Sequence, residues 1–419
     1  MIAEILATGE EIRTGALADT NSATIAGELE QAGVAVARLS GVGDDLELLA
    51  AVLSEIGGRA DIAVVTGGLG PTVDDLSSEA AAKAAGVELK LDPSAMASIE
   101  DFFRRRNRPM NPSIGKQAVL PSGAEVLFNP VGTAPGFSLV IGRCRFFFLP
   151  GVPFEMRRML ADQVLPRVAA LRGASREHRR VRTLSCYGLT ESLTGERLSG
   201  IDRAFPGVRL GLRAKFPEIQ VKLYAAGSGA EAVDALLAQA ETWARERLGD
   251  IVFSDAGESM AEAVGRLLQA RGATLALAES CTGGLVAHWL TETPGSSDYF
   301  LFSAVTYSNA SKARVLGVSE ETLQRCGAVS EETAAEMAAG ARRAAGAAYG
   351  LATSGIAGPS GGSPEKPVGT VCIGLAAGDR TLAWRFQYTY TGRSMYKQGF
   401  AMKALDLLRR ELLGLPHAP

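Results

Sequence analysis

Residues 273–285 read ATLALAESCTGGL, an apolar run that ends at a serine and is followed by a pair of glycines. An apolar run that breaks at glycines before a second apolar segment is typical of a buried strand, a tight turn and the start of a helix. This order places the Ser280 hydroxyl beside backbone N–H groups that lack partners within the helix. The stretch therefore predicts an α/β domain with a candidate nucleophile at the end of a strand.

The histidines of the chain are too few and too poorly placed to complete a Ser-His-Asp triad. Of the three, His178 lies in a charged run and His417 lies near the C-terminus, where chains commonly fray. His288 follows Ser280 by about two helical turns, at ~1.5 Å of rise per residue. Lys312 is therefore the predicted base, because a desolvated amine has a lowered pKa and accepts a serine proton. The alternative interpretation is that Ser280 caps a helix and Lys312 is solvated.

The composition is that of a globular chain with several domains. The 419 residues are 47% hydrophobic and 21% charged, and the formal net charge of −3 gives no general attraction for nucleic acid or anionic lipid. The five cysteines are odd in number and widely spaced, which predicts neither a zinc site nor a disulfide framework and favours a reducing compartment. We expect a cytoplasmic protein that contacts no membrane and binds no nucleic acid directly.

Three domains are predicted from the change of pattern along the chain. Residues 1–170 alternate strand and helix, which predicts a doubly wound parallel sheet that binds ligands beyond the carboxyl ends of its strands. Residues 171–253 predict a small α+β module, and residues 254–419 predict a second α/β domain. In the first domain we expect strands at 2–7, 34–39 and 61–66 and helices at 20–32, 45–56 and 74–85.

A second glycine-rich loop follows the third expected strand of the first domain. Thr66, Gly67, Gly68 and Gly70 allow a close backbone approach to a phosphate or pyrophosphate. The acids that follow, at positions 74 and 75, are oxygen ligands of the kind that Mg²⁺ uses between protein and phosphate. The alternative is that they cap the next helix and compensate its dipole, and both interpretations stay open.

The motifs together resemble the competence/damage-inducible protein A (CinA) family over essentially the full length of the chain. The first domain resembles the molybdopterin-binding fold through residues 9–11, 19–22, 66–75, 129–136 and 149–153. The last domain resembles the nicotinamide mononucleotide deamidase family through residues 278–284, 305–309 with Lys312, 327–330, 355–359 and 366–370.

The second resemblance implies hydrolysis of the carboxamide of nicotinamide mononucleotide to nicotinate mononucleotide and ammonia, without a cofactor. It assigns Ser280 as nucleophile, with Lys312 and Tyr307 as its proton-transfer partners. We expect N–H groups of the serine turn to face the oxyanion, and a second loop and a basic side chain to bind ribose or phosphate. The residues expected to bind substrate are Thr282, Gly283, Gly284, Gly355, Ile356, Ala357, Gly358 and Arg393. Lys397 stands where the family implies a second arginine, and lysine lacks the bidentate fork.

For the first domain, the resemblance implies a pyrophosphatase that cleaves ADP-ribose to AMP and ribose 5-phosphate with a divalent metal, Mg or Co. The expected metal ligands are Asp75, Asp74 and Asp19. The partners implied are small nucleotides, and the expected assembly is a homodimer. Two rival functions remain: a pterin-binding or nucleotidyl-transfer module, and a non-catalytic adaptor in DNA uptake or repair.

Overall fold

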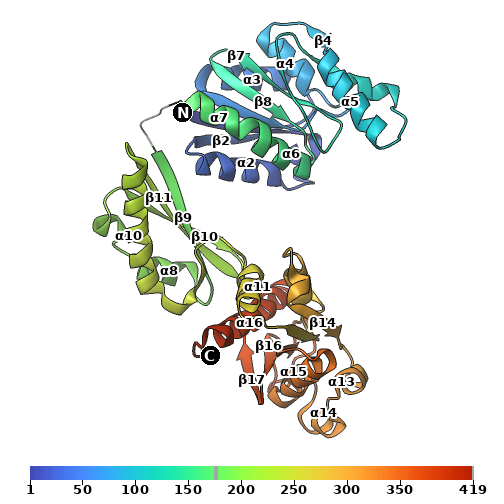
Figure 1. Cartoon of the computed structure of the whole chain (residues 1–419), viewed down its shortest axis with the longest axis vertical. Coiled ribbons are helices and arrows are strands. Elements are labelled where there is room, and N and C mark those ends of the chain that lie inside the picture. The colour runs from blue at the N-terminus through green and yellow to red at the C-terminus, as the bar shows by residue number, and fades with distance from the viewer. Residues whose placement is uncertain (174–177, 418–419) are drawn as a thin grey trace. The chain divides into compact units, whose positions relative to one another are not determined.

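The computed structural model describes residues 1–173 and 178–417 and divides into two compact units (Figure 1). The first unit comprises Met1–Arg180 with Ala226–Asp234, and the second comprises Val181–Ala225 with Ala235–Pro419. None of the helices within the described residues combines the length and the apolar character that crossing a membrane requires.

The first unit contains a six-stranded sheet in the order β2-β1-β3-β8-β7-β6. Its strands are β1 (Ile2–Thr8), β2 (Ala35–Val42), β3 (Ile62–Thr66), β6 (Glu125–Leu127), β7 (Gly136–Ile141) and β8 (Cys144–Leu149). The pairs β1/β2, β1/β3 and β3/β8 are parallel, whereas β6 and β7 extend the sheet in antiparallel pairing. The expected doubly wound sheet is therefore confirmed, with an antiparallel edge that the sequence reading did not include.

Helices cover both faces of this sheet, because successive strand residues point to opposite sides. Ile5 and Val64 pack with one set of helices, and their neighbours Leu6 and Val65 pack with the other. One set is α2 (Thr20–Gln31), α6 (Pro153–Met159) and α7 (Leu165–Arg172), and the other is α3 (Leu46–Arg59), α4 (Ser77–Ala85) and α5 (Pro93–Arg105). The short strands β4 (Leu89–Leu91) and β5 (Val119–Pro121) form a separate antiparallel pair.

The helix expected over residues 74–85 begins three residues later than predicted. The Asp75 carboxylate accepts hydrogen bonds from the Thr72 backbone N–H at 2.9 Å and from the Thr72 hydroxyl. These bonds hold residues 71–76 as a turn, so α4 begins at Ser77. Neither acid caps α4, whose N-cap is Leu76 without a side-chain hydrogen bond.

A four-stranded sheet in the order β10-β11-β9-β12 belongs to the expected α+β module, most of which lies in the second unit. Its elements are β9 (His178–Cys186), α8 (Glu191–Arg197), α9 (Ile201–Ala204), β10 (Val208–Lys215), β11 (Glu218–Gly227), α10 (Ala230–Leu248) and β12 (Val252–Ser254). Strands β10 and β11 pair as an antiparallel hairpin, in register from Val208 opposite Ala225 to Lys215 opposite Glu218.

A five-stranded mixed sheet in the order β14-β13-β15-β16-β17 forms the rest of the second unit. Its strands are β13 (Leu275–Glu279), β14 (Phe300–Val305), β15 (Tyr349–Gly355), β16 (Thr370–Ala377) and β17 (Arg380–Gln387). Its helices are α11 (Met260–Ala270), α12 (Leu285–Thr291), α13 (Asn309–Leu316), α14 (Glu320–Cys326), α15 (Glu331–Ala345) and α16 (Arg393–Leu413). Strand β13 lies between parallel neighbours β14 and β15, and every residue of it is buried.

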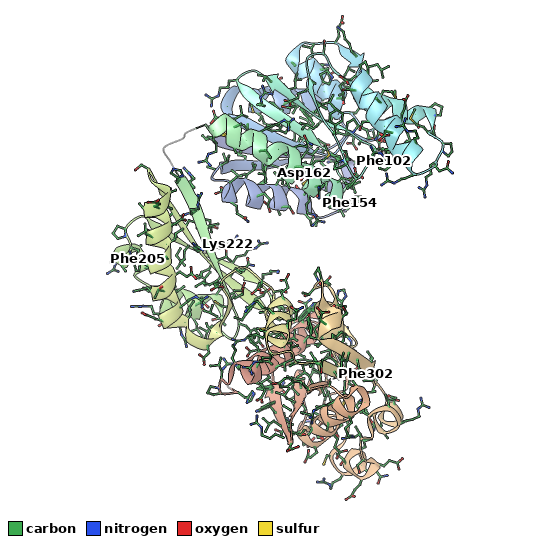
Figure 2. All side chains as sticks on the ribbon, in the orientation of Figure 1. Phe102, Phe154, Asp162, Phe205, Lys222 and Phe302 are labelled. Carbon is green, nitrogen blue, oxygen red and sulfur yellow. The ribbon has the colours of Figure 1, made fainter. Side chains whose placement is uncertain are left out.

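The side chains of β13 alternate between two hydrophobic cores. Leu275 and Leu277 pack with residues of α11, α12 and α16, whereas Ala276 and Ala278 pack with residues of α14 and α15. Phe302 on β14 is partly buried against the second of these cores (Figure 2). The same alternation sends residue 279 towards α12 and residue 280 towards α13.

Candidate active site

Ser280 and Lys312 meet at the carboxyl end of β13. Ser280 follows the last strand residue, and Lys312 lies on α13 with its side chain fully buried. The Lys312 Nζ donates hydrogen bonds to the Ser280 Oγ at 3.0 Å and to the Thr306 carbonyl oxygen at 2.7 Å, with a longer contact of 3.4 Å to the Tyr307 carbonyl oxygen. A neutral amine that donates its two hydrogens to those carbonyls directs its lone pair at the serine hydroxyl.

Burial lowers the pKa of Lys312 from its ordinary value, because the charged ammonium loses its hydration. The alternative that Lys312 is solvated is therefore wrong. The other half of that alternative is also wrong, because the N-cap of α12 is Gly284 and not Ser280. A serine and a buried lysine with a lowered pKa, in hydrogen-bond contact, have the arrangement that a nucleophile and its base require.

The turn after Ser280 depends on two glycines with left-handed backbone conformations. Gly283 has φ +62° and Gly284 has φ +91°, which other residues adopt only with strain. The Gly283 N–H donates to the Ser280 carbonyl oxygen at 3.1 Å, so this expected oxyanion donor is already engaged within the turn. Among the described residues, the Thr282 N–H is the donor of the expected pair that has no acceptor, and Thr282 itself is fully buried.

The hydroxyl of Tyr307 bonds to Arg393, and no hydrogen bond joins it to Ser280 or Lys312 among the described residues. Arg393, at the start of α16, donates from Nη2 to the Tyr307 hydroxyl at 2.9 Å and from Nη1 to the Gly358 carbonyl oxygen at 2.6 Å. Tyr307 is 62% exposed, and its contact with Lys312 is made by its backbone carbonyl. Arg393 therefore joins two segments of the expected substrate site, and the tyrosine hydroxyl belongs to its rim.

The remaining expected residues of this site lie close to the serine turn. Lys397 is one turn after Arg393 on α16, and a Cβ on Gly283 would lie 3.5 Å from the Lys397 Nζ. Gly355 is the last residue of β15, and Ile356 and Ala357 follow it; the Ile356 N–H donates to the Thr370 carbonyl oxygen at 2.8 Å. Lys397 thus lies beside the serine turn, and Arg393, one helical turn before it, contacts Gly358 and Tyr307.

Cys281 is a second potential nucleophile in the turn, but its ionisation is suppressed. Burial raises the pKa of its thiol to about 12, so the thiol stays protonated near neutral pH. Since the thiolate is the reactive form of cysteine, Ser280 remains the candidate nucleophile of this turn.

The glycine loop of the first unit is held tightly by its neighbours. The Thr66 hydroxyl donates to the Pro150 carbonyl oxygen at 3.0 Å and accepts from the Asn21 side-chain amide at 3.0 Å. Gly67 and Gly68 have φ values of +107° and +64°, and a Cβ on Gly67 would clash with the Thr8 carbonyl oxygen. The loop therefore requires glycine at these positions.

The three acids expected to bind a metal do not come together as a ligand cage. Asp19 caps α2 by accepting from the Ser22 N–H at 2.8 Å, and Asp75 is engaged by Thr72 and lies against Gly70. In the part of the chain that the structure describes, no group of three His, Cys, Asp or Glu residues is placed to hold a metal. Asp19, Asp74 and Asp75 therefore do not form a metal site that protein ligands alone would complete.

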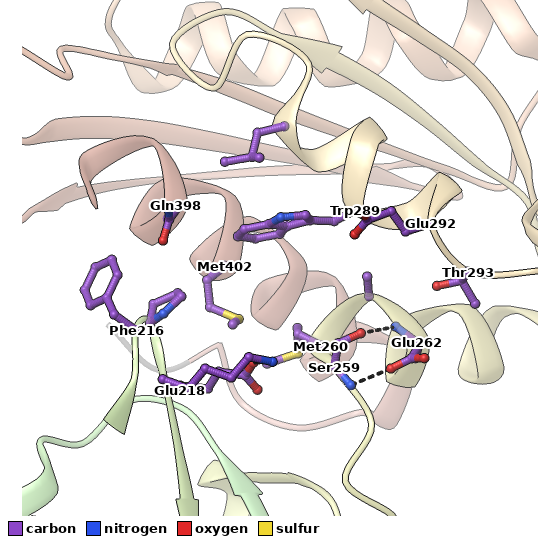
Figure 3. A pocket seen from close by; sticks show the side chains of 14 residues that line it. Phe216, Glu218, Ser259, Met260, Glu262, Trp289, Glu292, Thr293, Gln398 and Met402 are labelled. Atoms are coloured by element: carbon purple, nitrogen blue, oxygen red, sulfur yellow. Dashed lines mark hydrogen bonds and ion pairs between the residues drawn. The ribbon is translucent and has the colours of Figure 1, made fainter. Parts of the chain in front are cut away.

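A separate cavity of about 470 Å³ lies in the second unit between the β10/β11 hairpin and helices α11, α12 and α16 (Figure 3). Phe216, Trp289 and Met402 contribute apolar surface, and none of Ser280, Lys312 and Tyr307 lines it. Its charged and polar groups have partners within the chain, as in the Lys215–Glu218 ion pair and the Ser259–Glu262 capping box. This cavity is not part of the serine site.

The sequence reasoning missed Glu279, whose carboxylate is buried beside the serine turn. The only signal was a charged residue at the end of an otherwise apolar strand. Thr306 and Thr353 were also missed. Each contributes its backbone carbonyl oxygen, which accepts from the Lys312 Nζ in the case of Thr306 and from the Ser280 N–H in the case of Thr353, and the residue type does not predict such contacts.

Three family models match the chain in succession. They are described as a probable molybdopterin binding domain over residues 4–170, the damage-inducible protein CinA KH domain over 181–254, and the CinA C-terminal domain over 257–412. The crystal structure of the competence/damage-inducible protein CihA of Agrobacterium tumefaciens is 40% identical, with a TM-score of 0.35, and covers 36% of this chain and 94% of that chain.

Relatives match the chain from end to end. A CinA-like protein of Desulfosudis oleivorans is 54% identical over 99% of this chain and 100% of its own length. A CinA-like protein of Geobacter metallireducens is 48% identical over 98% of each chain. The chain therefore belongs to the CinA family.

Proposed function

We propose that the C-terminal domain is an amidohydrolase that converts nicotinamide mononucleotide to nicotinate mononucleotide and ammonia. The observation that carries the proposal is the 3.0 Å contact between the buried Lys312 Nζ and the Ser280 Oγ. The resemblance to the deamidase family supports the choice of substrate. The cationic pair on α16 supports a substrate with a phosphate group.

The reaction follows from the placement of these groups. The Ser280 oxygen attacks the amide carbon while its proton passes to the neutral Lys312 amine. The Thr282 N–H donates to the oxyanion of the tetrahedral intermediate. Collapse of the intermediate breaks the C–N bond, and the Lys312 ammonium returns the proton to the departing nitrogen, which leaves as ammonia. Water then attacks the acyl-serine ester and gives a proton to Lys312. The C–Oγ bond breaks, Lys312 returns that proton to the Ser280 oxygen, and the product leaves as the carboxylate.

The purified chain incubated with nicotinamide mononucleotide tests this proposal. We expect release of ammonia with stoichiometric formation of nicotinate mononucleotide, measured by coupled assay and mass spectrometry. Nicotinamide riboside, which lacks the phosphate, is the matched substrate control and is expected to react with at least tenfold lower kcat/KM. Absence of ammonia from the mononucleotide contradicts the proposal.

Cys281→Ala is expected to retain deamidase activity within about threefold of the parent, because the protonated thiol takes no part in the chemistry. The same variant is expected to lose a few degrees of melting temperature, since Cys281 packs against Gly355 in the core. Rates of ammonia release and melting curves check both statements. Loss of activity in this variant, without loss of folded protein, contradicts assignment of the nucleophile to Ser280.

For the N-terminal domain, we propose ADP-ribose pyrophosphatase activity at the Gly67 loop. Two polar atoms near the loop, the buried Thr8 Oγ1 and Asn21 Oδ1, have no hydrogen-bond partner among the described residues and are available to a polar ligand. The proposal rests on the loop and not on a metal cage. The activity is assayed as AMP and ribose 5-phosphate with Mg²⁺, with Co²⁺ and with EDTA, and binding of a pterin without cleavage favours the rival module.

Gly67→Ala is expected to abolish ADP-ribose cleavage while leaving deamidation unchanged, because the added Cβ meets the Thr8 carbonyl oxygen and the φ of +107° is strained. Gly123→Ala is the matched control. Gly123 also has a positive φ, of +84°, but a Cβ there meets nothing within 4 Å. Equal pyrophosphatase rates in the two variants, measured on folded protein, would show that the loop is not the site.

A further inference from the structure

Glu279 is the charged side chain closest in sequence to the nucleophile, and it is only 1% exposed. It lies at the end of β13, where the alternation of the strand directs it towards α12, opposite to Ser280. A buried carboxylate is costly unless hydrogen bonds compensate the loss of hydration. Its partners therefore indicate what it does.

All the partners of this carboxylate belong to the serine turn and the first turn of α12. Oε2 accepts from the Thr282 hydroxyl at 2.7 Å, from the Gly284 N–H at 2.8 Å and from the Val286 N–H at 3.3 Å. Oε1 accepts from the Ala287 N–H at 2.9 Å. One side chain thus holds the turn at both of its ends.

The network continues into the neighbouring strand β15. The Thr282 hydroxyl lies 2.7 Å from the Thr353 hydroxyl, and the Ser280 N–H donates to the Thr353 carbonyl oxygen at 2.9 Å. The backbone of the nucleophile and the side chain of Glu279 are therefore connected to the same residue of the sheet. A shift of the turn would alter these contacts together.

Glu279 also determines which N–H groups remain for the substrate. Its carboxylate engages the N–H groups of Gly284, Val286 and Ala287, so the start of α12 is not available to the phosphate or to the oxyanion. Among the described residues, the N–H of the buried Thr282 has no acceptor. The oxyanion donor is thus separated from the helix donors.

We propose that Glu279 is a positioning residue for the serine reaction: its carboxylate holds the 280–287 turn so that Ser280 Oγ meets Lys312 and the Thr282 N–H meets the oxyanion. This inference rests on the proposed amidohydrolase activity. Glu279 touches no reacting atom, and it acts through the turn alone.

Glu279→Gln tests this inference with little change of volume. Every partner of the carboxylate is a donor, so the NH₂ group of glutamine faces at least one N–H donor in either orientation. We expect kcat to fall at least tenfold with KM for nicotinamide mononucleotide within threefold, because misplacement of reacting groups lowers the chemical step more than binding. The pH midpoint of the rate is expected to stay unchanged, since Lys312 stays buried and keeps its contacts with the carbonyl oxygens of Thr306 and Tyr307, which lie outside the turn.

Glu292→Gln is the matched control, because Glu292 is an exposed glutamate at the other end of α12. It is expected to react as the parent does. If Glu279→Gln fails to fold, Thr282→Val takes its place, since it removes one hydrogen bond to the same carboxylate, and a threefold or greater loss of kcat is expected. A folded Glu279→Gln variant, or a folded Thr282→Val variant in its absence, with the parental kcat overturns the inference.

A readout without the substrate separates this inference from the proposed function. A fluorophosphonate labels an activated serine: the Ser280 oxygen bonds to phosphorus, fluoride leaves, and the hydroxyl proton passes to Lys312. We expect Glu279→Gln to slow labelling of Ser280, measured by mass spectrometry, at least fivefold. Slowed labelling together with an inactive parent supports positioning by Glu279 and contradicts deamidation; equal labelling of both proteins overturns the inference.

Discussion

Ser280→Ala is expected to lower ammonia release from nicotinamide mononucleotide by at least about 10³-fold, which is the scale of loss when a catalytic nucleophile is removed. In the proposed reaction the hydroxyl forms the covalent bond to the acyl group. Neither neighbour in the turn replaces it, because the Cys281 thiol is protonated and the Thr282 hydroxyl donates to the buried Glu279 carboxylate. Rates of ammonia release measure the loss. Melting temperature is expected to change by no more than a few degrees, since one hydroxyl with one side-chain hydrogen bond is removed.

The N-terminal domain provides an internal control for this variant. ADP-ribose cleavage, where the parent shows it, is expected to be unchanged in Ser280→Ala, because the serine is in the other compact unit. Deamidation at the parental rate in this variant would exclude Ser280 as the nucleophile.

Lys312→Met is expected to be as damaging as loss of the serine. Methionine fills a similar volume in the buried site and has no amine, so the change removes the base with little effect on packing. The double variant is expected to be little worse than either single one, because residues that act as one unit are not additive. Parental activity in Lys312→Met with loss of activity in His288→Ala would show that the base is the histidine, which is 61% exposed beside Glu292.

The pH dependence of the parent follows from the same lysine. Only the neutral amine is a base, so kcat/KM is expected to rise with pH and to reach its plateau below the ordinary lysine pKa of ~10.4, since burial lowers the pKa of Lys312. Lys312→Arg is the matched variant that keeps the positive charge. Arginine stays protonated throughout this range, so this variant is expected to be inactive at every pH. A rate that falls with rising pH would contradict the role of Lys312 as base.

Local sequence pattern was sufficient to place the strand and the candidate nucleophile. The apolar run before Ser280 is β13, and the glycines after it form the turn, because both features depend on neighbouring residues alone. The pairing of Ser280 with Lys312 was predicted by elimination of the three histidines, and the structure brings the two side chains into contact.

Contacts between distant segments were beyond reach of the sequence. The direction of the Tyr307 hydroxyl depends on Arg393, which follows it by 86 positions. Helix α4 begins late because the Asp75 carboxylate accepts a hydrogen bond from the Thr72 N–H, and this local turn competes with helix formation. The sequence shows Glu279 as a charge at a strand end, and only the folded turn shows its donors.

Because the side chains of Glu279 and Ser280 point to opposite faces of the sheet, the number of residues in β13 is constrained. Substitution of one apolar residue for another within the strand keeps the carboxylate towards α12 and the hydroxyl towards α13. Insertion or deletion of a single residue reverses both, because each position changes face with a shift of one. In a laboratory collection of random variants selected for deamidation, β13 is therefore expected to accumulate exchanges and to exclude changes in length.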